Sequence, residues 1–180
     1  MSSILLKGGH LIDPANGRDE TADVLLVDGR VAVVGSDAQG QAPEGVSEVD
    51  VTGKIVCPGL IDIHVHFREP GQTAKESIET GAAAAAKGGF TTVVCMPNTS
   101  PAIDSPGTVS LIQDSAQRSS KVNVLSSGAI TKGIAGEELA PIGSLKSAGV
   151  VAITDDGNCV QNNELIQCLT NEAQAATGGG

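Results

Sequence analysis

Strand-like and helix-like segments alternate four times after Pro58, and this alternation limits the fold more than any other feature of the chain. Strands are predicted at 59–66, 90–96, 122–125 and 150–154, and helices at 73–87, 105–119, 137–147 and 162–175. Such a series predicts a parallel β/α architecture, either a small doubly wound sheet or part of a (β/α)8 barrel. A complete barrel needs about 250 residues, so the chain after Pro58 has room for only about half of one.

Local signals support these elements. Ser105-Pro106 is a typical helix start, because serine caps the first turn and proline suits the first helical position. Gly88-Gly89 follows the alanine-rich helix at 73–87 and is a typical helix end. The run 90–96 is continuously apolar, which favours a strand buried on both faces of a sheet.

The first 57 residues have a different pattern, with short β-type runs and no helical period. Asp28-Gly29 separates the runs 24–27 and 31–34 and is a strong hairpin signal. Thr52-Gly53 marks a second turn, between strand candidates at 48–51 and 54–56, and another candidate lies at 4–6. We therefore predict a small β-sandwich-like domain at 1–57, a partial β/α barrel at 58–180, and a flexible tail at 177–180.

Composition excludes several classes of partner. The formal net charge of −10 argues against nucleic acid and anionic membrane surfaces, since both need basic patches. Phe67 and Phe90 are the only aromatic residues, so the chain has no platform on which bases could stack. The start of the chain lacks the pattern of a signal peptide, and no apolar run is long enough to span a bilayer.

The four cysteines are far apart and lack CxxC spacing. A disulfide framework or a zinc ribbon is therefore not expected. Reduced and mostly buried thiols in a cytoplasmic protein are the prediction that fits this spacing.

His64-Val65-His66-Phe67-Arg68 is the segment that indicates chemistry. It follows an apolar run, and residues i and i+2 of a strand point to the same side, so the rings of His64 and His66 should converge. Two converging imidazoles are half of a metal site. Arg68 has the same parity and can present two parallel donors to a carboxylate.

Other polar residues follow the later strands, where parallel β/α folds place their functional groups. Asn98 can donate and accept hydrogen bonds at once, which suits a ligand with an amide and a carboxylate. Asp156 or Asp155 can supply an oxygen ligand to a divalent metal.

Each of these residues also has an ordinary structural interpretation. A single HxH occurs by chance, and Asn98 and the Asp-Asp-Gly segment are common types of turn. Arg68 could form a surface ion pair with Glu69, and His10 is interpreted as structural or exposed. Two of the three histidines fall in one motif, however, which favours the metal interpretation.

These motifs carry a family resemblance. Residues 59–71, Gly-Leu-Ile-Asp-Ile-His-Val-His-Phe-Arg-Glu-Pro-Gly, are similar to the metal-binding motif of cyclic amidohydrolases. Residues 90–99, ending in Met-Pro-Asn-Thr, and 154–157, Thr-Asp-Asp-Gly, resemble the dihydroorotases in particular. The similarity covers nearly all of residues 4–170, with three motifs in order on three strand ends.

The resemblance implies an α/β fold: the N-terminal part of an amidohydrolase-type (β/α)8 barrel, about four β/α units, preceded by a small β-domain. It implies a hydrolase with two zinc ions per complete site. His64 and His66 match ligands of the more buried zinc, and Asp156 matches the carboxylate that bridges both metals. Arg68 and Asn98 match the residues that bind the substrate carboxylate.

The implied reaction is the reversible cyclisation of N-carbamoyl-L-aspartate to (S)-dihydroorotate in pyrimidine biosynthesis, by a cytoplasmic homo-oligomer. The family's later histidine ligands and its general base are expected beyond residue 180, so no general base is assigned within this chain. Two alternatives stay open. One is a non-catalytic, dihydroorotase-like partner of aspartate transcarbamoylase, and the other is a related amidohydrolase such as an allantoinase.

Overall fold

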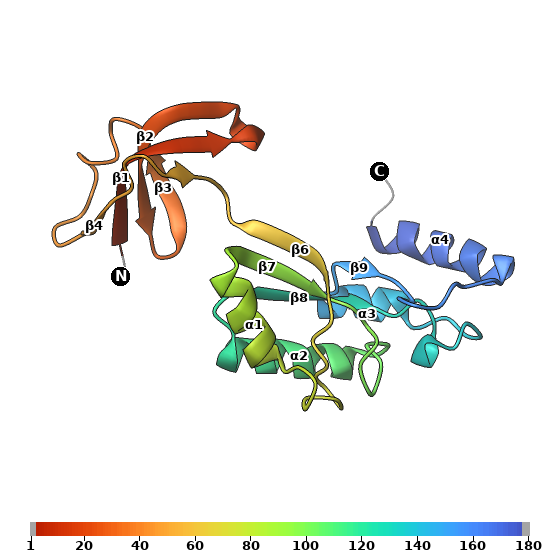
Figure 1. The fold of residues 1–180 in the computed structure, drawn as a ribbon. Helices are drawn as coiled ribbons and strands as arrows, with labels where there is room; N and C mark the ends of the chain where they lie inside the picture. The colour runs from red at the N-terminus through yellow and green to blue at the C-terminus, as the bar shows by residue number, and fades with distance from the viewer. Residues whose placement is uncertain (1–2, 178–180) are drawn as a thin grey trace. The chain divides into compact units, whose positions relative to one another are not determined.

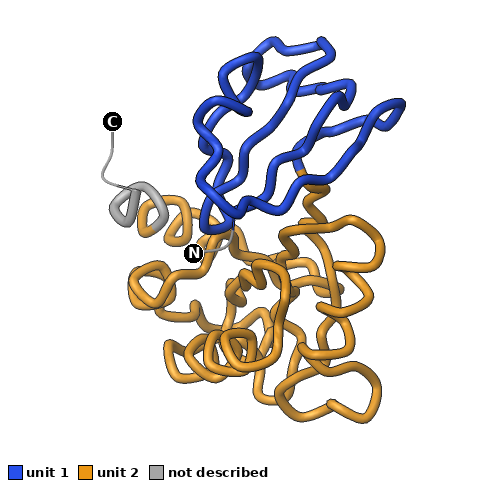
Figure 2. Tube along the Cα trace, turned by 90° about the vertical axis from the view of Figure 1, so that its left-hand side faces the viewer, with its two compact units in different colours: residues 1–58 blue, residues 59–180 orange. Residues whose placement is uncertain are grey.

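The computed structural model describes residues 3–177, and side chains up to residue 172. The chain divides into two compact units, Met1–Pro58 and Gly59–Gly180, which Figure 2 colours separately. That they are two domains, with boundaries at 1–57 and 58–180, stays a prediction. The predicted tail at 177–180 lies outside the described residues except for Thr177, the last residue of the final helix.

The first unit contains one five-stranded sheet. Its strands are β1 (Ser3–Asp13), β2 (Arg18–Val27), β3 (Arg30–Val34), β4 (Ser47–Asp50) and β5 (Ile55–Val56), with a short 3-10 helix, η1 (Pro14–Asn16), between the first two. The predicted hairpin around Asp28-Gly29 is confirmed by the antiparallel pairing of β2 with β3. The strands on either side of Thr52-Gly53 do not pair with each other. Instead, β4 and β5 both pair with β1 in parallel.

The second unit contains a four-stranded sheet in which all neighbouring strands are parallel (Figure 1). Its strands are β6 (Leu60–Val65), β7 (Phe90–Cys95), β8 (Asn123–Gly128) and β9 (Ala152–Ile153). Its helices are α1 (Ile78–Lys87), α2 (Pro106–Ser119), α3 (Ile142–Ala148) and α4 (Asn163–Thr177), with a 3-10 turn, η2 (Lys132–Ile134).

The strand order decides between the two architectures that the sequence left open. The strands lie in chain order, β6-β7-β8-β9, without the reversal that defines a doubly wound sheet. Right-handed connections between sequential parallel strands place their helices on one face. The second unit is therefore a half-barrel, and the predicted fold class is confirmed.

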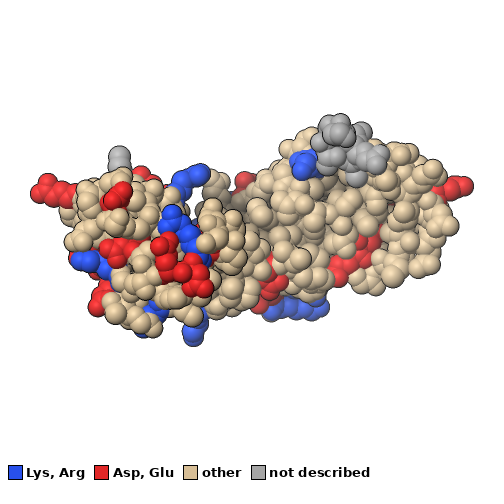
Figure 3. All heavy atoms as spheres, turned by 90° about the horizontal axis from the view of Figure 1, so that it is seen from above, with Lys and Arg blue, Asp and Glu red and all other residues tan. Residues whose placement is uncertain are grey.

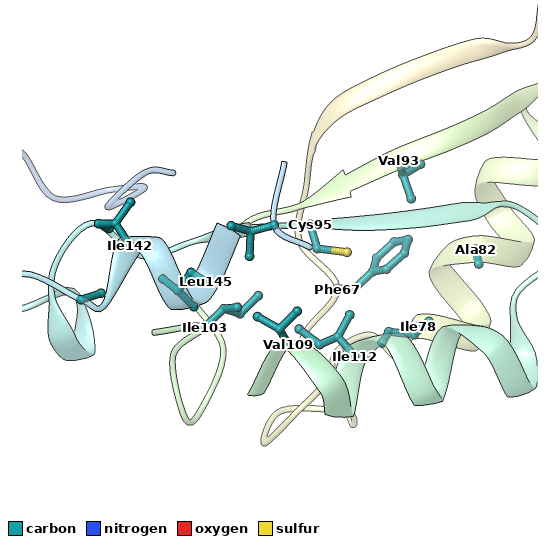
Figure 4. Packing of buried hydrophobic residues seen from close by; sticks show 12 residues of the cluster. Phe67, Ile78, Ala82, Val93, Cys95, Ile103, Val109, Ile112, Ile142 and Leu145 are labelled. Atoms are coloured by element: carbon teal, nitrogen blue, oxygen red, sulfur yellow. The ribbon is translucent and has the colours of Figure 1, made fainter. Parts of the chain in front are cut away.

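One hydrophobic core joins the helices to the sheet (Figure 4). It includes Ile78 from α1, Val109 and Ile112 from α2, and Leu145 from α3, together with Val93 from β7. Each of these side chains is at most 2% exposed. Burying such a side chain contributes about 1.5–3 kcal/mol, so this core holds α1, α2 and α3 to the strands that end at the candidate site.

Two helices begin later than predicted. α1 starts at Ile78 because Ser77 caps it, accepting a hydrogen bond from the backbone N–H of Thr80. The predicted start at 73 was therefore too early. α3 starts after Pro141, not at 137, because the residue before a proline is disfavoured in helical conformation.

The prediction that the cysteines are mostly buried was wrong. All four are free, but Cys57, Cys159 and Cys168 are exposed and only Cys95 is buried. Cys95 lies in the core between sheet and helices, and this burial raises the pKa of its thiol to about 12. The spacing of cysteines says nothing about which strand or helix face each one occupies.

No helix within the described residues is long and apolar enough to cross a membrane. On the face drawn in Figure 3, Lys and Arg side chains lie at scattered places, several of them beside Asp and Glu.

Candidate metal centre

Both histidines of the HxH motif lie at the carboxyl end of β6: His64 is in the strand, and His66 follows its last residue. The pairing of β6 with β7 shifts between Asp62 and Val65, so one extra residue is accommodated in β6. Bulges of this kind change the direction of side chains near functional sites. After the bulge, Val65 and Phe67 pack into the core, and His64 and His66 alternate with them.

Asp156 reaches the same place from the loop after β9. The carboxylate Oδ1 lies 3.3 Å from the Nε2 atom of His64, and Oδ2 lies 3.5 Å from the Nε2 atom of His66. The two imidazole rings are edge to face, with centroids 5.2 Å apart. The two rings share one side, as their spacing predicts, and the Asp156 carboxylate lies beside both; that these residues bind a metal stays a prediction.

These three residues fit a metal ion. Each offers one ligand atom, and the ligand atoms all lie within 4.8 Å of one another. Imidazole nitrogen and carboxylate oxygen are both ordinary zinc ligands. The side chain of Asp156 is 18% exposed and that of His64 is 55% exposed, so the group is accessible from solvent.

Asn98, in the loop after β7, contacts two of the candidate ligands. Its side-chain Oδ1 lies 2.9 Å from Nδ1 of His66, and its Nδ2 donates to Oδ2 of Asp156 at 2.7 Å. Arg68 is half-buried and donates to the backbone oxygen of Asn98 at 3.4 Å. The structure thus brings all five predicted site residues together at the carboxyl ends of the strands.

Asp155 points away from this group and is buried. Its Oδ1 accepts hydrogen bonds from the backbone N–H groups of Ile130 and Thr131, at 2.7 and 3.0 Å, and its Oδ2 accepts one from the Thr131 hydroxyl. It therefore fastens the loop after β9 to the loop after β8. The sequence left the roles of Asp155 and Asp156 open until the family resemblance was considered, because both carboxylates follow the same strand.

Sequence reasoning missed two supporting carboxylates. Asp62 accepts a hydrogen bond from the backbone N–H of His64 at 3.0 Å. Glu69 accepts one from the backbone N–H of Ile78 and another from the hydroxyl of Ser115, at 2.9 and 2.6 Å, which ties the loop after β6 to α1 and α2. Only the position of Asp62 and Glu69 beside the HxH motif could have suggested such roles.

Among solved structures, the L-hydantoinase (dihydropyrimidinase) from Arthrobacter aurescens superposes with a TM-score of 0.79 at 23% identity. The match covers 98% of this chain and 39% of that chain, and at this identity it shows the fold alone. The half-barrel and the small sheet therefore each resemble that hydantoinase in fold.

Sequence comparison identifies the family to which the chain belongs. The profile of the dihydro-orotase-like family matches residues 53–176. The chain is 52% identical over 165 residues to the dihydroorotase of Citrifermentans bemidjiense, and 52% identical over the same length to that of Geobacter sp. strain M21. The chain belongs to the dihydro-orotase-like family. It covers 38% of the length of either relative.

Proposed function

We propose that these 180 residues supply the metal-binding histidine pair of a zinc-dependent dihydroorotase. The reaction would be the reversible cyclisation of N-carbamoyl-L-aspartate to (S)-dihydroorotate in pyrimidine biosynthesis. One observation carries the proposal: His64 at the end of β6, His66 just after it and Asp156 in the loop after β9 converge on one point. The same residues lie in a chain about 50% identical to proteins named dihydroorotase.

We propose zinc as the metal, with two ions in a complete site. Two imidazole nitrogens and a carboxylate oxygen suit zinc, and the second oxygen of Asp156 would be available to a second ion. When bound, zinc supplies Lewis acidity that polarises a carbonyl. A catalytic zinc usually has three protein ligands, so two metals need more ligands than His64, His66 and Asp156 provide.

Arg68 and Asn98 are proposed to bind the substrate carboxylate. A guanidinium can hold a carboxylate through two parallel N–H groups, and Arg68 is anchored beside Asn98 by its bond to the Asn98 backbone oxygen. This arrangement would orient a small anionic substrate next to the three candidate ligands. The attraction of the Arg68 guanidinium for the substrate carboxylate matters because the chain as a whole carries a formal charge of −10 and would repel an anion.

A chimera tests the function. The aligned part of the C. bemidjiense dihydroorotase would be replaced by this chain, and dihydroorotate hydrolysis measured with zinc present. We expect activity that His66→Ala abolishes and that Arg68→Lys weakens mainly through a higher KM, since lysine lacks the two-pronged contact.

The same assay separates the alternatives. A folded, zinc-loaded chimera that hydrolyses allantoin but not dihydroorotate would contradict the proposed substrate. A folded chimera that is inactive on both, yet co-elutes with aspartate transcarbamoylase, would favour the non-catalytic partner. Homo-oligomeric assembly in the cytoplasm is part of the proposal, and the absence of disulfides among the four cysteines is compatible with that compartment.

A further inference from the structure

The side-chain amide of Asn98 forms a bridge between two candidate metal ligands, and its chemistry fixes the direction of each hydrogen bond. An ionised carboxylate can only accept hydrogen bonds, so the Asn98 atom that faces Oδ2 of Asp156 at 2.7 Å must be the amide nitrogen. The amide oxygen then faces Nδ1 of His66 at 2.9 Å. Because an amide oxygen can only accept, Nδ1 of His66 must carry the proton.

This proton assignment determines what the other ring nitrogen does. In a neutral imidazole with its proton on Nδ1, Nε2 carries a lone pair. That Nε2 atom lies 3.5 Å from Oδ2 of Asp156, so two acceptors face each other without a proton between them. A cation placed between them would satisfy both, whereas without a cation the two lone pairs repel each other.

We infer that Asn98 is a positioning residue of the metal centre: its amide holds the proton of His66 on Nδ1, directs Nε2 toward Asp156, and fixes the carboxylate by donating to it. This inference rests on the proposed function, and it adds a role for Asn98 beyond binding substrate. The amide nitrogen has two hydrogens, so donation to Asp156 leaves a second donor for a substrate carboxylate. Partners of this kind orient metal-ligating histidines and usually change metal affinity by about 10–100-fold when removed.

The first measurement needs no substitution. A long-range ¹H–¹⁵N spectrum of the metal-free 180-residue chain, recorded where its histidines are neutral, reports the tautomer of each ring. The chain has three histidines, so the variants His10→Gln and His64→Gln assign the signals of His66. We expect His66 to carry its proton on Nδ1. A proton on Nε2 would overturn the inference.

The second measurement is calorimetric titration with Zn²⁺ alone. We expect Asn98→Ala to weaken zinc binding by about 10–100-fold relative to the wild-type chain. Asn123→Ala is the matched control, because Asn123 is an exposed asparagine of the same sheet whose amide bonds to Thr92 at 3.2 Å. Its zinc affinity should equal that of the wild type.

The outcomes separate the two claims. Wild-type zinc affinity in a folded Asn98→Ala variant would overturn the inference and leave the proposed function standing. A wild-type chain that binds no zinc would contradict the proposed metal site itself, and the inference with it. If Asn98→Ala fails to fold by circular dichroism, the wild-type tautomer decides: protonation on Nδ1 supports the inference and protonation on Nε2 overturns it.

Discussion

At the scale of single residues, the adjacent carboxylates of Asp155 and Asp156 have separate environments. Asp155 is 4% exposed and accepts hydrogen bonds from two backbone N–H groups and the Thr131 hydroxyl. Asp156 faces His64 and His66. One residue therefore maintains the loop, and the other is available to a metal.

This difference predicts opposite effects of two substitutions. Asp155→Ala leaves buried donors without a partner and should lower the free energy of unfolding by at least about 2 kcal/mol. Asp156→Ala should change stability by less than about 0.5 kcal/mol but greatly weaken zinc binding, because it removes one of three ligands. Urea denaturation and zinc titration of both variants check this. The two roles would be reversed if a stable Asp155→Ala variant lost zinc binding while the Asp156→Ala variant kept it.

Which residues lie together at the candidate site was largely predictable at this scale. His64 and His66 have i, i+2 spacing, and Asn98 follows an apolar strand. Both signals are local, so the sequence pattern alone reveals them. The contacts of Asn98 with His66 and Asp156 were not predictable. They depend on the packing of loops from three strands, which no local pattern encodes.

At the scale of elements, α1 packs on the residue that follows the HxH motif. A Cβ atom at Gly81 would come within 2.2 Å of the Phe67 ring. Phe67 lies in the core, and in the sequence it stands between His66 and Arg68. Glycine in α1 therefore permits the close approach of helix and ring. The starts of α1 and α3 were predicted less well than the strand positions, because they are set by the Ser77 cap and by Pro141.

We expect Gly81→Ala to destabilise the chain by about 1–3 kcal/mol, since overpacking outweighs the gain in helix propensity. Gly143→Ala in α3 is the matched control, because its new methyl group would meet nothing within 4 Å. That variant should be neutral or more stable by up to about 1 kcal/mol. Thermal unfolding of both proteins checks the pair. Equal stability of the two variants would show that Phe67 can move without cost.

At the scale of the whole molecule, the half-barrel has an apolar edge strand. Leu60, Ile61 and Ile63 of β6 are 52%, 63% and 73% exposed, and within the described residues β6 pairs with β7 alone. Exposed strand edges and apolar patches favour association.

The general architecture was predictable because four strand–helix units in sequence leave few alternatives. The choice between a barrel and a doubly wound sheet needed the strand order, which is a property of the complete sheet.

Because of this exposed edge, the isolated 180-residue chain should associate as its concentration rises. It should also not turn over dihydroorotate, because a two-metal site needs more ligands than these residues supply. Light scattering should show a larger apparent mass at higher concentration. Ile61→Lys should reduce this association, while Ile55→Lys in the first unit, 67% exposed, should reduce it less. A monomer with steady turnover would contradict both expectations.

The central claim is that His64, His66 and Asp156 hold a zinc ion. Anomalous diffraction at the zinc edge, from crystals of this chain grown with Zn²⁺, tests it most directly. The account predicts a peak about 2.0–2.1 Å from the Nε2 atoms of both histidines and about 2.0–2.2 Å from an oxygen of Asp156. Ordered zinc elsewhere on the chain, with His64 and His66 turned to opposite faces of β6, would contradict it.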